Sequence, residues 1–260
     1  MKKQKVIRNC IWILCICYLI SMMIHLLTKP RNEDVIPILG FHEIVSDEEK
    51  DSTYASNMWV DSRSNFLEKM EYLHDQGYTT WTLDELYAWK QGKKEKLGKT
   101  VVLTFDDGYA SSSEWIAPTL KKYGFHATTF VIGSMVTDTK HTVYLTYDQM
   151  KDQSIMQYAS HTFALHDQDN GFLMDQKSIG QLREDFEKQK QVSDISYIAY
   201  PYGHVNESML KVCKEYQVKL GFCYHENKMA KRSDDDLQLP RFAITATTSM
   251  DSFRAMLEQY

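Results

Sequence analysis

The sequence has no internal repeat, no low-complexity tract and no Pro-, Gly- or Ser-rich linker long enough to separate two domains. Its 260 residues, 43% of them hydrophobic, are enough for one sizeable core and not comfortably for two. We therefore expect one globular domain.

Cysteine is rare, with five in the chain. Cys10, Cys15 and Cys17 lie in an apolar run near the N-terminus, which leaves only Cys213 and Cys223 in the rest of the chain. These two leave a disulfide open without requiring one. Cysteine usage therefore points to no particular redox compartment.

Asp, Glu, Lys and Arg are all missing between Cys10 and Thr28. At about 1.5 Å per helical residue this run just spans a hydrocarbon core of about 30 Å. No A-x-A-like cleavage site follows it, so an uncleaved signal anchor is favoured over a cleaved signal peptide. Four basic residues precede the run and two follow it, which places the N-terminus inside and the domain outside. The expected organisation is a cytoplasmic N-terminus (1–9), a transmembrane signal anchor (10–28), a short linker (29–34) and an extracytoplasmic domain (35–260) at the cell membrane.

Acidic residues are absent before Asn32, where six basic residues occur. The chain carries a net charge of −5, so the remainder from Asn32 onward carries −11. Nucleic acid and other polyanions are thus unlikely partners on electrostatic grounds, whereas a neutral or partly cationic polymer is not repelled.

Apolar runs alternate with amphipathic stretches, which is typical of α/β proteins and favours a parallel, barrel-like arrangement. Helices are expected at 112–123, 178–191 and 206–216, around Phe66, Met70 and Leu73, and after a Thr82/Glu85 capping box. The strand-like runs are 35–41, 100–105, 127–133, 155–160, 195–200, 218–224 and 242–246. In such barrels the catalytic side chains lie where strands end.

TFDDGY ends one of these runs and places Asp106 and Asp107 side by side before Gly108. A cation bound to one carboxylate offsets their mutual repulsion, so the other can stay ionised and act as a base. For an isolated motif, a solvated Asp-Gly turn that caps the next helix is the better interpretation. A second cluster of polar residues favours the catalytic interpretation over the solvated turn.

SHTFALH follows the next but one strand-like run and contains His161 and His166. Histidines five residues apart do not share a helix face, so the spacing suits a loop that turns both rings toward one point. With Asp107 they supply two nitrogens and one oxygen, an open 2-His-1-carboxylate set for zinc or a similar divalent ion.

Two further strand ends and the start of the last run carry polar residues. Tyr202 lies in a Pro-Tyr-Gly turn whose backbone N–H groups can face the metal, and His42 follows the first run. Taken alone, the first is a turn and the second a structural histidine. Arg241 precedes the last run and is by default an ion-paired surface residue.

Together, TFDDGY and SHTFALH resemble the polysaccharide deacetylases with a NodB-homology domain, carbohydrate esterase family 4, over roughly residues 35–246. The resemblance implies a distorted (β/α) barrel and a metal-dependent hydrolase. It also implies roles for the quoted residues: Asp106 as catalytic base, Asp107, His161 and His166 as metal ligands, and the Tyr202 backbone amide as part of the oxyanion hole.

The chain departs from the common pattern of that family. Ala199 stands where the family has arginine, and no Leu-x-His occurs near the C-terminus. In both respects the sequence is similar to the branch that deacetylates poly-β-1,6-N-acetylglucosamine of biofilms, which implies His42 as the acid. From motif order, Arg241 is a hypothesis for restoring the missing charge.

The expected reaction is removal of acetyl groups from N-acetylglucosamine residues of an extracellular polysaccharide, with zinc as the expected metal. Peptidoglycan deacetylation is an alternative, because the anchor and TFDDGY also suit it. O-acetyl ester hydrolysis is another, because metal and base do not by themselves distinguish an amide from an ester. A glycan-binding protein that keeps the barrel without turnover is the alternative of another class.

Overall fold

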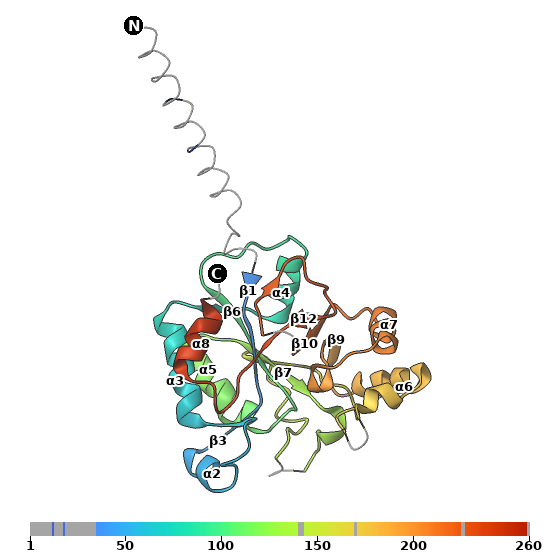
Figure 1. The fold of residues 1–260 in the computed structure, drawn as a ribbon. Helices are drawn as coiled ribbons and strands as arrows, with labels where there is room; N and C mark the ends of the chain where they lie inside the picture. The colour runs from blue at the N-terminus through green and yellow to red at the C-terminus, as the bar shows by residue number, and fades with distance from the viewer. Residues whose placement is uncertain are drawn as a thin grey trace, which may run out of the picture.

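The computed structural model describes Trp12, Tyr18 and residues 35–139, 143–168, 171–224 and 227–258. In this part of the chain, short parallel strands form a barrel with helices packed around it (Figure 1). The expected membrane anchor at 10–28 lies outside the described residues, apart from Trp12 and Tyr18. Among the described residues, no helix has the length and hydrophobicity to cross a bilayer.

The barrel strands lie in the order β12, β10, β9, β8, β7, β6, β2 and β13, and all neighbours are parallel. Between β12 and β13, at the two ends of this order, the sequence has only Arg241. One extended segment therefore pairs with β10 at its start and with β2 at its end, and the barrel is nearly closed, as the sequence predicts. The bounds are β2 (Ile38–Phe41), β6 (Thr100–Phe105), β7 (Ala127–Val131), β8 (Met156–Ser160), β9 (Asp194–Ala199), β10 (Leu220–Cys223), β12 (Leu239–Pro240) and β13 (Phe242–Ala243).

Short strands form two separate pairs, and one more strand joins β6. β1 (Val35–Ile36) pairs with β11 (Ala230–Lys231), β3 (Glu43–Val45) with β4 (Val60–Ser62), and β5 (Thr79–Thr80) with the start of β6. The strand expected over 35–41 is divided at Pro37, which has no backbone N–H to donate. The last two expected strands are shorter than their apolar runs.

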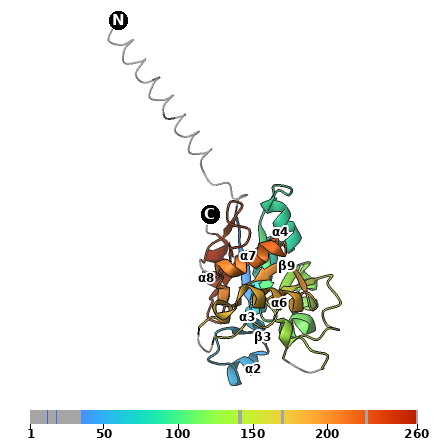
Figure 2. The same cartoon turned by 90° about the vertical axis from the view of Figure 1, so that its right-hand side faces the viewer.

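Helices cover the outside of the barrel (Figures 1 and 2). α6 and α7 lie together on one side, while α3, α5 and α8 pack on the other. The predicted capping box of Thr82 and Glu85 is present at the start of α4. Two helices, α2 and α8, were not predicted from the sequence. The bounds are α2 (Asp47–Ser52), α3 (Arg63–Asp75), α4 (Leu83–Lys90), α5 (Ala117–Tyr123), α6 (Ile179–Gln189), α7 (Glu207–Glu215) and α8 (Met250–Leu257), with short turns η2 (Ser112–Ile116), η3 (Gly133–Met135), η4 (Leu173–Gln176) and η5 (Pro201–Gly203).

Alternate residues of each barrel strand point inward. Leu103 of β6 packs outward in the cluster of α3, α5 and α8, whereas Val102 lies in the interior cluster with Phe130 and Phe222. That interior cluster also contains three residues of α4, so α4 closes the barrel at the end where the strands begin. The opposite end, where the strands finish, is left for polar side chains.

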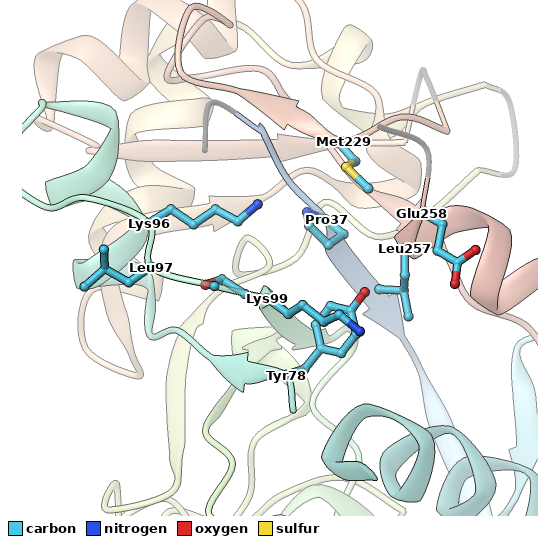
Figure 3. Close-up of a pocket in the computed structure, with 10 residues that line it drawn as sticks. Pro37, Tyr78, Lys96, Leu97, Lys99, Met229, Leu257 and Glu258 are labelled. Carbon is cyan, nitrogen blue, oxygen red and sulfur yellow. The ribbon is translucent and has the colours of Figure 1, made fainter. Parts of the chain in front are cut away.

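A cavity of about 560 Å³ lies at the end where the strands begin, between Pro37, Thr100 and Leu257 (Figure 3). It is therefore at the opposite end of the barrel from the predicted catalytic residues. Cys213 and Cys223 are both buried, and both are free thiols. The disulfide that the sequence left open is therefore not formed in this structure.

Candidate active site

Strand alternation places four side chains at the mouth of the barrel, where the strands end. Asp106 continues the inward positions of β6, and His42 those of β2. In the same way Tyr224 follows β10 and Arg241 follows β12. Gly40 permits this packing, because a Cβ there would lie only 2.1 Å from the Tyr224 hydroxyl. The barrel thus gathers residues from distant parts of the chain.

Left-handed backbone conformations turn the next residues toward the same point. Asp107 has φ +73°, Thr162 has φ +67° and Tyr202 has φ +58°. Residues other than glycine rarely adopt this backbone conformation, and strained residues of this kind cluster at functional sites. In an extended strand Asp106 and Asp107 would point to opposite faces. The turn at Asp107 brings both carboxylates to the barrel mouth.

Asp107, His161 and His166 form a set of potential metal ligands, with one ligand atom of each within 4.8 Å of the others. Asp107 Oδ1 lies 3.4 Å from His161 Nε2 and 3.2 Å from His166 Nε2. His161 Nδ1 lies 2.7 Å from the carbonyl oxygen of Ala199. A proton on Nδ1 for this hydrogen bond leaves the lone pair of Nε2 for a cation, as in many metal sites. The three residues therefore fit a divalent metal ion.

Neighbouring groups shift the pKa values of Asp107 and His161. Burial opposes ionisation of Asp107, but hydrogen bonds with His161 and His166 outweigh burial and hold its pKa well below the usual value. Burial also acts to lower the pKa of His161, yet the hydrogen bond with Asp107 and the charges of the two aspartates raise it. A cation would compensate the same carboxylates in place of the imidazolium protons.

Asp106 forms a buried ion pair with Arg241. Arg241 Nη1 donates to Oδ1 at 2.7 Å and Nη2 to Oδ2 at 2.8 Å, and the Tyr224 hydroxyl donates to Oδ2 at 3.0 Å. The guanidinium also lies 4.1 Å from the centroid of the Tyr224 ring. Burial opposes ionisation of Asp106, but the charge and hydrogen bonds of Arg241 together with the charges of His161 and His42 lower its pKa. The carboxylate is thus ionised and fixed in orientation.

His42 lies beside this carboxylate, with Nε2 3.9 Å from Asp106 Oδ2. Its Nδ1 is buried without a hydrogen-bond partner. The ring packs against Trp59 at a centroid distance of 4.5 Å, and Trp59 is 41% exposed. Burial is the largest effect on His42 and lowers its pKa, although the nearby aspartates oppose this.

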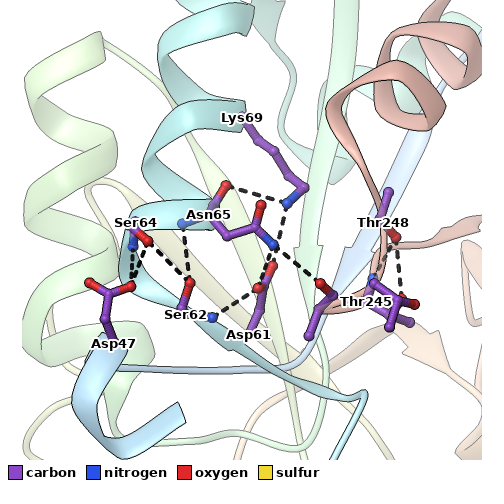
Figure 4. A network of polar contacts seen from close by, with 10 residues as sticks. Asp47, Asp61, Ser62, Ser64, Asn65, Lys69, Thr245 and Thr248 are labelled. Atoms are coloured by element: carbon purple, nitrogen blue, oxygen red, sulfur yellow. Dashed lines mark hydrogen bonds and ion pairs between the residues drawn. The ribbon is translucent and has the colours of Figure 1, made fainter. Parts of the chain in front are cut away.

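A polar network fixes the segment that carries Trp59 (Figure 4). Asp61 of β4 accepts hydrogen bonds from Asn65 at 2.7 Å and from buried Lys69 at 3.5 Å. Asn65 also donates to the carbonyl oxygen of Ala246, and the Ala246 N–H donates to the carbonyl oxygen of Met58. The network therefore ties the residue before Trp59 to α3 and to the loop that follows β13.

Tyr202 forms an exposed aromatic wall on the other side of the mouth. Its ring lies 4.5 Å from that of His166, and Phe172 lies 5.9 Å from Tyr202. Phe172 in turn stacks on His204 at 4.0 Å. Exposed aromatic faces beside a polar centre are well suited to contact sugar rings.

The structure thus brings together every residue that the sequence singled out: His42, Asp106, Asp107, His161, His166, Tyr202 and Arg241. Arg241 is fully buried, not at the surface as an isolated reading of its motif suggests. Trp59 was missed, and no sequence pattern points to it. Tyr224 was also not among the predicted site residues, although its alternation with Leu220 and Phe222 marks it as an inward position.

Comparisons with known proteins agree with this geometry. Residues 93–221 match the polysaccharide deacetylase family. The chain is 31% identical over 238 residues to Bacillus subtilis (strain 168) YxkH, which is named as a polysaccharide deacetylase, and the match covers 88% of this chain and 78% of that protein. It is 25% identical over 248 residues to the poly-β-1,6-N-acetyl-D-glucosamine N-deacetylase of Staphylococcus epidermidis, covering 89% of this chain and 80% of that protein. The solved structure of Streptococcus pyogenes deacetylase PplD in complex with acetate has a TM-score of 0.73 and 27% identity, covering 87% of this chain and 100% of that chain.

Fold, site and relatives define a hydrolase of carbon–nitrogen bonds, a deacetylase. The chain belongs to the polysaccharide deacetylase family, with a domain of the NodB type.

Proposed function

We propose that this enzyme is a metal-dependent N-deacetylase of poly-β-1,6-N-acetylglucosamine. The observation that carries the proposal is the buried contact between Arg241 and Asp106, because it supplies the charge that Ala199 cannot. The early position of His42 beside the same carboxylate supports the same branch of the family. The name of the Staphylococcus epidermidis relative agrees with this substrate.

The reaction adds water to the acetamide carbonyl carbon and breaks the carbon–nitrogen bond, which yields acetate and a free sugar amine. A divalent ion on Asp107, His161 and His166, with zinc as our proposal, supplies a Lewis acid that lowers the pKa of water. Asp106 takes the proton of the attacking water. His42 gives a proton to the departing amine, since an unprotonated amide nitrogen is a poor leaving group.

Three groups support these proton transfers. Arg241 holds both oxygens of Asp106, so the base stays ionised and aimed. Tyr224 donates to the same carboxylate from the barrel wall. In the proposed mechanism the backbone N–H of Tyr202 donates to the oxyanion, which needs donors that are already oriented.

We also propose that residues 10–28 anchor the enzyme in the cell membrane, with the domain from residue 35 outside. The uncharged run and the basic residues before it support this placement. Protease added to intact cells should then degrade the domain and leave the N-terminal peptide protected. Protection of the domain would contradict the proposed location.

The substrate is tested by acetate release from β-1,6-linked and β-1,4-linked N-acetylglucosamine oligomers, with zinc and with chelator. Metal-dependent release that favours the β-1,6 oligomers is expected. Release from β-1,4 oligomers alone would support a cell-wall substrate, and cleavage of O-acetyl esters alone would support an esterase. An Asp106→Asn variant is the control for contaminating activity.

A further inference from the structure

A second pocket of about 310 Å³ lies next to the catalytic mouth. It is formed where β3 leaves the barrel and passes α2, the start of α3 and η2. Glu43, which lines it, directly follows His42, and the charge of Asp107 acts on Glu43. The pocket and the proposed reaction centre therefore lie on neighbouring parts of the same surface. The polar side chains that line it are Glu43, Ser46, Glu49, Tyr54, Arg63, Ser111 and Glu114.

Glu43 is a buried carboxyl group without a cation. It is 7% exposed, and its Oε2 atom has no hydrogen-bond partner. The described residues include no basic side chain in an ion pair with it. Burial is the largest effect on Glu43 and raises its pKa to about 8. A buried carboxylate is costly unless a positive group pairs with it, so the fold leaves a position that a cation can fill.

The surroundings of Glu43 also favour a positive ligand. Glu49 and Glu114 bring two more carboxylates to the lining, and hydrogen bonds with Ser46 lower the pKa of Glu49. Arg63 is the one basic residue of the lining, and its guanidinium lies 4.3 Å from the centroid of the Trp115 ring. Acidic groups thus outnumber basic ones three to one.

The lining can also bind hydroxyl groups. Ser111 is 8% exposed, and its hydroxyl group lies beside Glu43, where it acts to lower the pKa of the carboxyl group and can still accept a hydrogen bond from a ligand. Tyr54 and Trp115 add aromatic surface. A ligand that carries one ammonium group and several hydroxyl groups matches this combination, and a bare cation does not use it.

We propose that this pocket binds a glucosamine unit, the deacetylated sugar in its ammonium form, while another unit of the same polymer occupies the catalytic mouth. This inference rests on the proposed function, because deacetylation converts a neutral acetamide into an amine that is protonated at neutral pH. An ammonium group offers three donors to Glu43 and its neighbours, whereas an N-acetyl group offers one donor and no charge. The enzyme then binds partly deacetylated chains more tightly than fully acetylated ones.

Direct binding of monosaccharides to the full chain tests the pocket. D-glucosamine is titrated against N-acetyl-D-glucosamine and ammonium chloride by calorimetry at pH 7, for wild type, Glu43→Gln and Glu48→Gln. Glu48 is the matched control, because it lies on α2 outside the pocket lining. Glucosamine should bind to wild type and Glu48→Gln alike, and at least tenfold more weakly to Glu43→Gln. Glu114→Gln, at the rim, should weaken glucosamine binding about two- to fivefold and guards against a folding defect of Glu43→Gln.

Equal binding of glucosamine and N-acetylglucosamine would overturn the inference. So would unchanged glucosamine affinity in Glu43→Gln, or competition by ammonium chloride at the same concentration as glucosamine. Turnover distinguishes the two proposals. Acetate release without glucosamine binding contradicts this inference alone, whereas glucosamine binding without acetate release from any oligomer contradicts the proposed function.

A kinetic comparison then measures the consequence for the polymer. β-1,6 oligomers with one glucosamine unit should have a higher kcat/KM than fully acetylated oligomers of equal length. Glu43→Gln should remove that preference, and Glu48→Gln should retain it. If Glu43→Gln retains the preference for oligomers with a glucosamine unit, another part of the surface recognises that unit, which contradicts the proposal.

Discussion

Arg241 and Asp106 form a two-pronged ion pair that is almost completely buried, with side chains 0% and 1% exposed. They lie 135 residues apart in the sequence and meet because β12 and β6 both end at the barrel mouth. Arg241 also donates to the Thr104 hydroxyl at 3.0 Å, one inward position below Asp106. The guanidinium therefore links the point where the barrel closes to the proposed catalytic base.

Arg241→Ala should lose most turnover and destabilise the fold. Removing one partner of a buried pair leaves the other charge uncompensated, at a cost of about 3–5 kcal/mol. Arg241→Lys keeps the charge but loses the paired geometry, so its turnover should be intermediate. Urea unfolding and acetate release, compared at equal folded fraction, check both effects.

Arg254→Ala is the matched control, because Arg254 lies exposed on α8, forms an ion pair with exposed Asp251 and lies 5.4 Å from the centroid of the Tyr72 ring, far from the barrel mouth. Its free energy of unfolding should change by about 1 kcal/mol or less. Unchanged turnover in fully folded Arg241→Ala would rule out a role for Arg241 in catalysis.

The position of Arg241 shows what the sequence can and cannot predict. Motif order alone suggested that Arg241 replaces the charge missing at Ala199, because strand ends converge in a parallel barrel. The buried contact with Asp106 arises because one short segment, residues 239–243, pairs with β10 at its start and with β2 at its end. The hydrophobic periodicity of the sequence does not predict that pairing. The strand over 100–105 was predicted to the residue, since an unbroken apolar run has few other interpretations.

Trp59 and Glu43 are residues whose place near the site could not be predicted from the sequence. Trp59 contacts His42 only because the network of Asp61, Asn65 and Lys69 holds its segment against the loop after β13. Glu43 looks like an ordinary surface residue beside His42 until the fold buries it. Local patterns therefore find strand-end motifs, whereas long-range packing decides what surrounds them.

Asp106→Asn should retain metal and lose most turnover, while Asp107→Asn and His161→Ala should lose metal affinity as well. Asp106 already has donors for both oxygens in Arg241 and Tyr224, whereas Asp107 Oδ1 faces the Nε2 atoms of His161 and His166. Metal content after dialysis and acetate release are measured on the same samples. Equal metal loss in Asp106→Asn and Asp107→Asn would contradict the separation of base from ligand.

Asp61→Asn should destabilise the fold by about 3 kcal/mol, because it leaves the ammonium group of fully buried Lys69 without its partner. The double variant Asp61→Asn/Lys69→Met should recover part of this loss, since methionine buries no charge. A double-mutant cycle by urea unfolding gives the coupling energy. The exposed pair Lys188–Glu184 is the control and should show about 0.3–0.5 kcal/mol. Coupling of the same size in both pairs would contradict the buried role of Lys69.

Glu43 should make the stability of the protein fall as pH rises from about 4.5 to about 8. The folded protein keeps the Glu43 proton up to the raised pKa of about 8, whereas the unfolded chain releases it near the ordinary value of 4.5. The folded state thus binds more protons in this interval, and one such group lowers the free energy of unfolding by about 1.4 kcal/mol per pH unit. Glu43→Gln cannot ionise, so its stability relative to wild type should rise across the same interval. Urea unfolding of both proteins at pH 5, 6, 7 and 8 measures the difference, and glucosamine added at pH 8 should reduce it by pairing with the ionised carboxylate. Parallel stability curves for wild type and Glu43→Gln would show that Glu43 ionises as readily in the folded protein as in the unfolded chain. Its carboxylate would then already be compensated, which contradicts the premise of the glucosamine pocket.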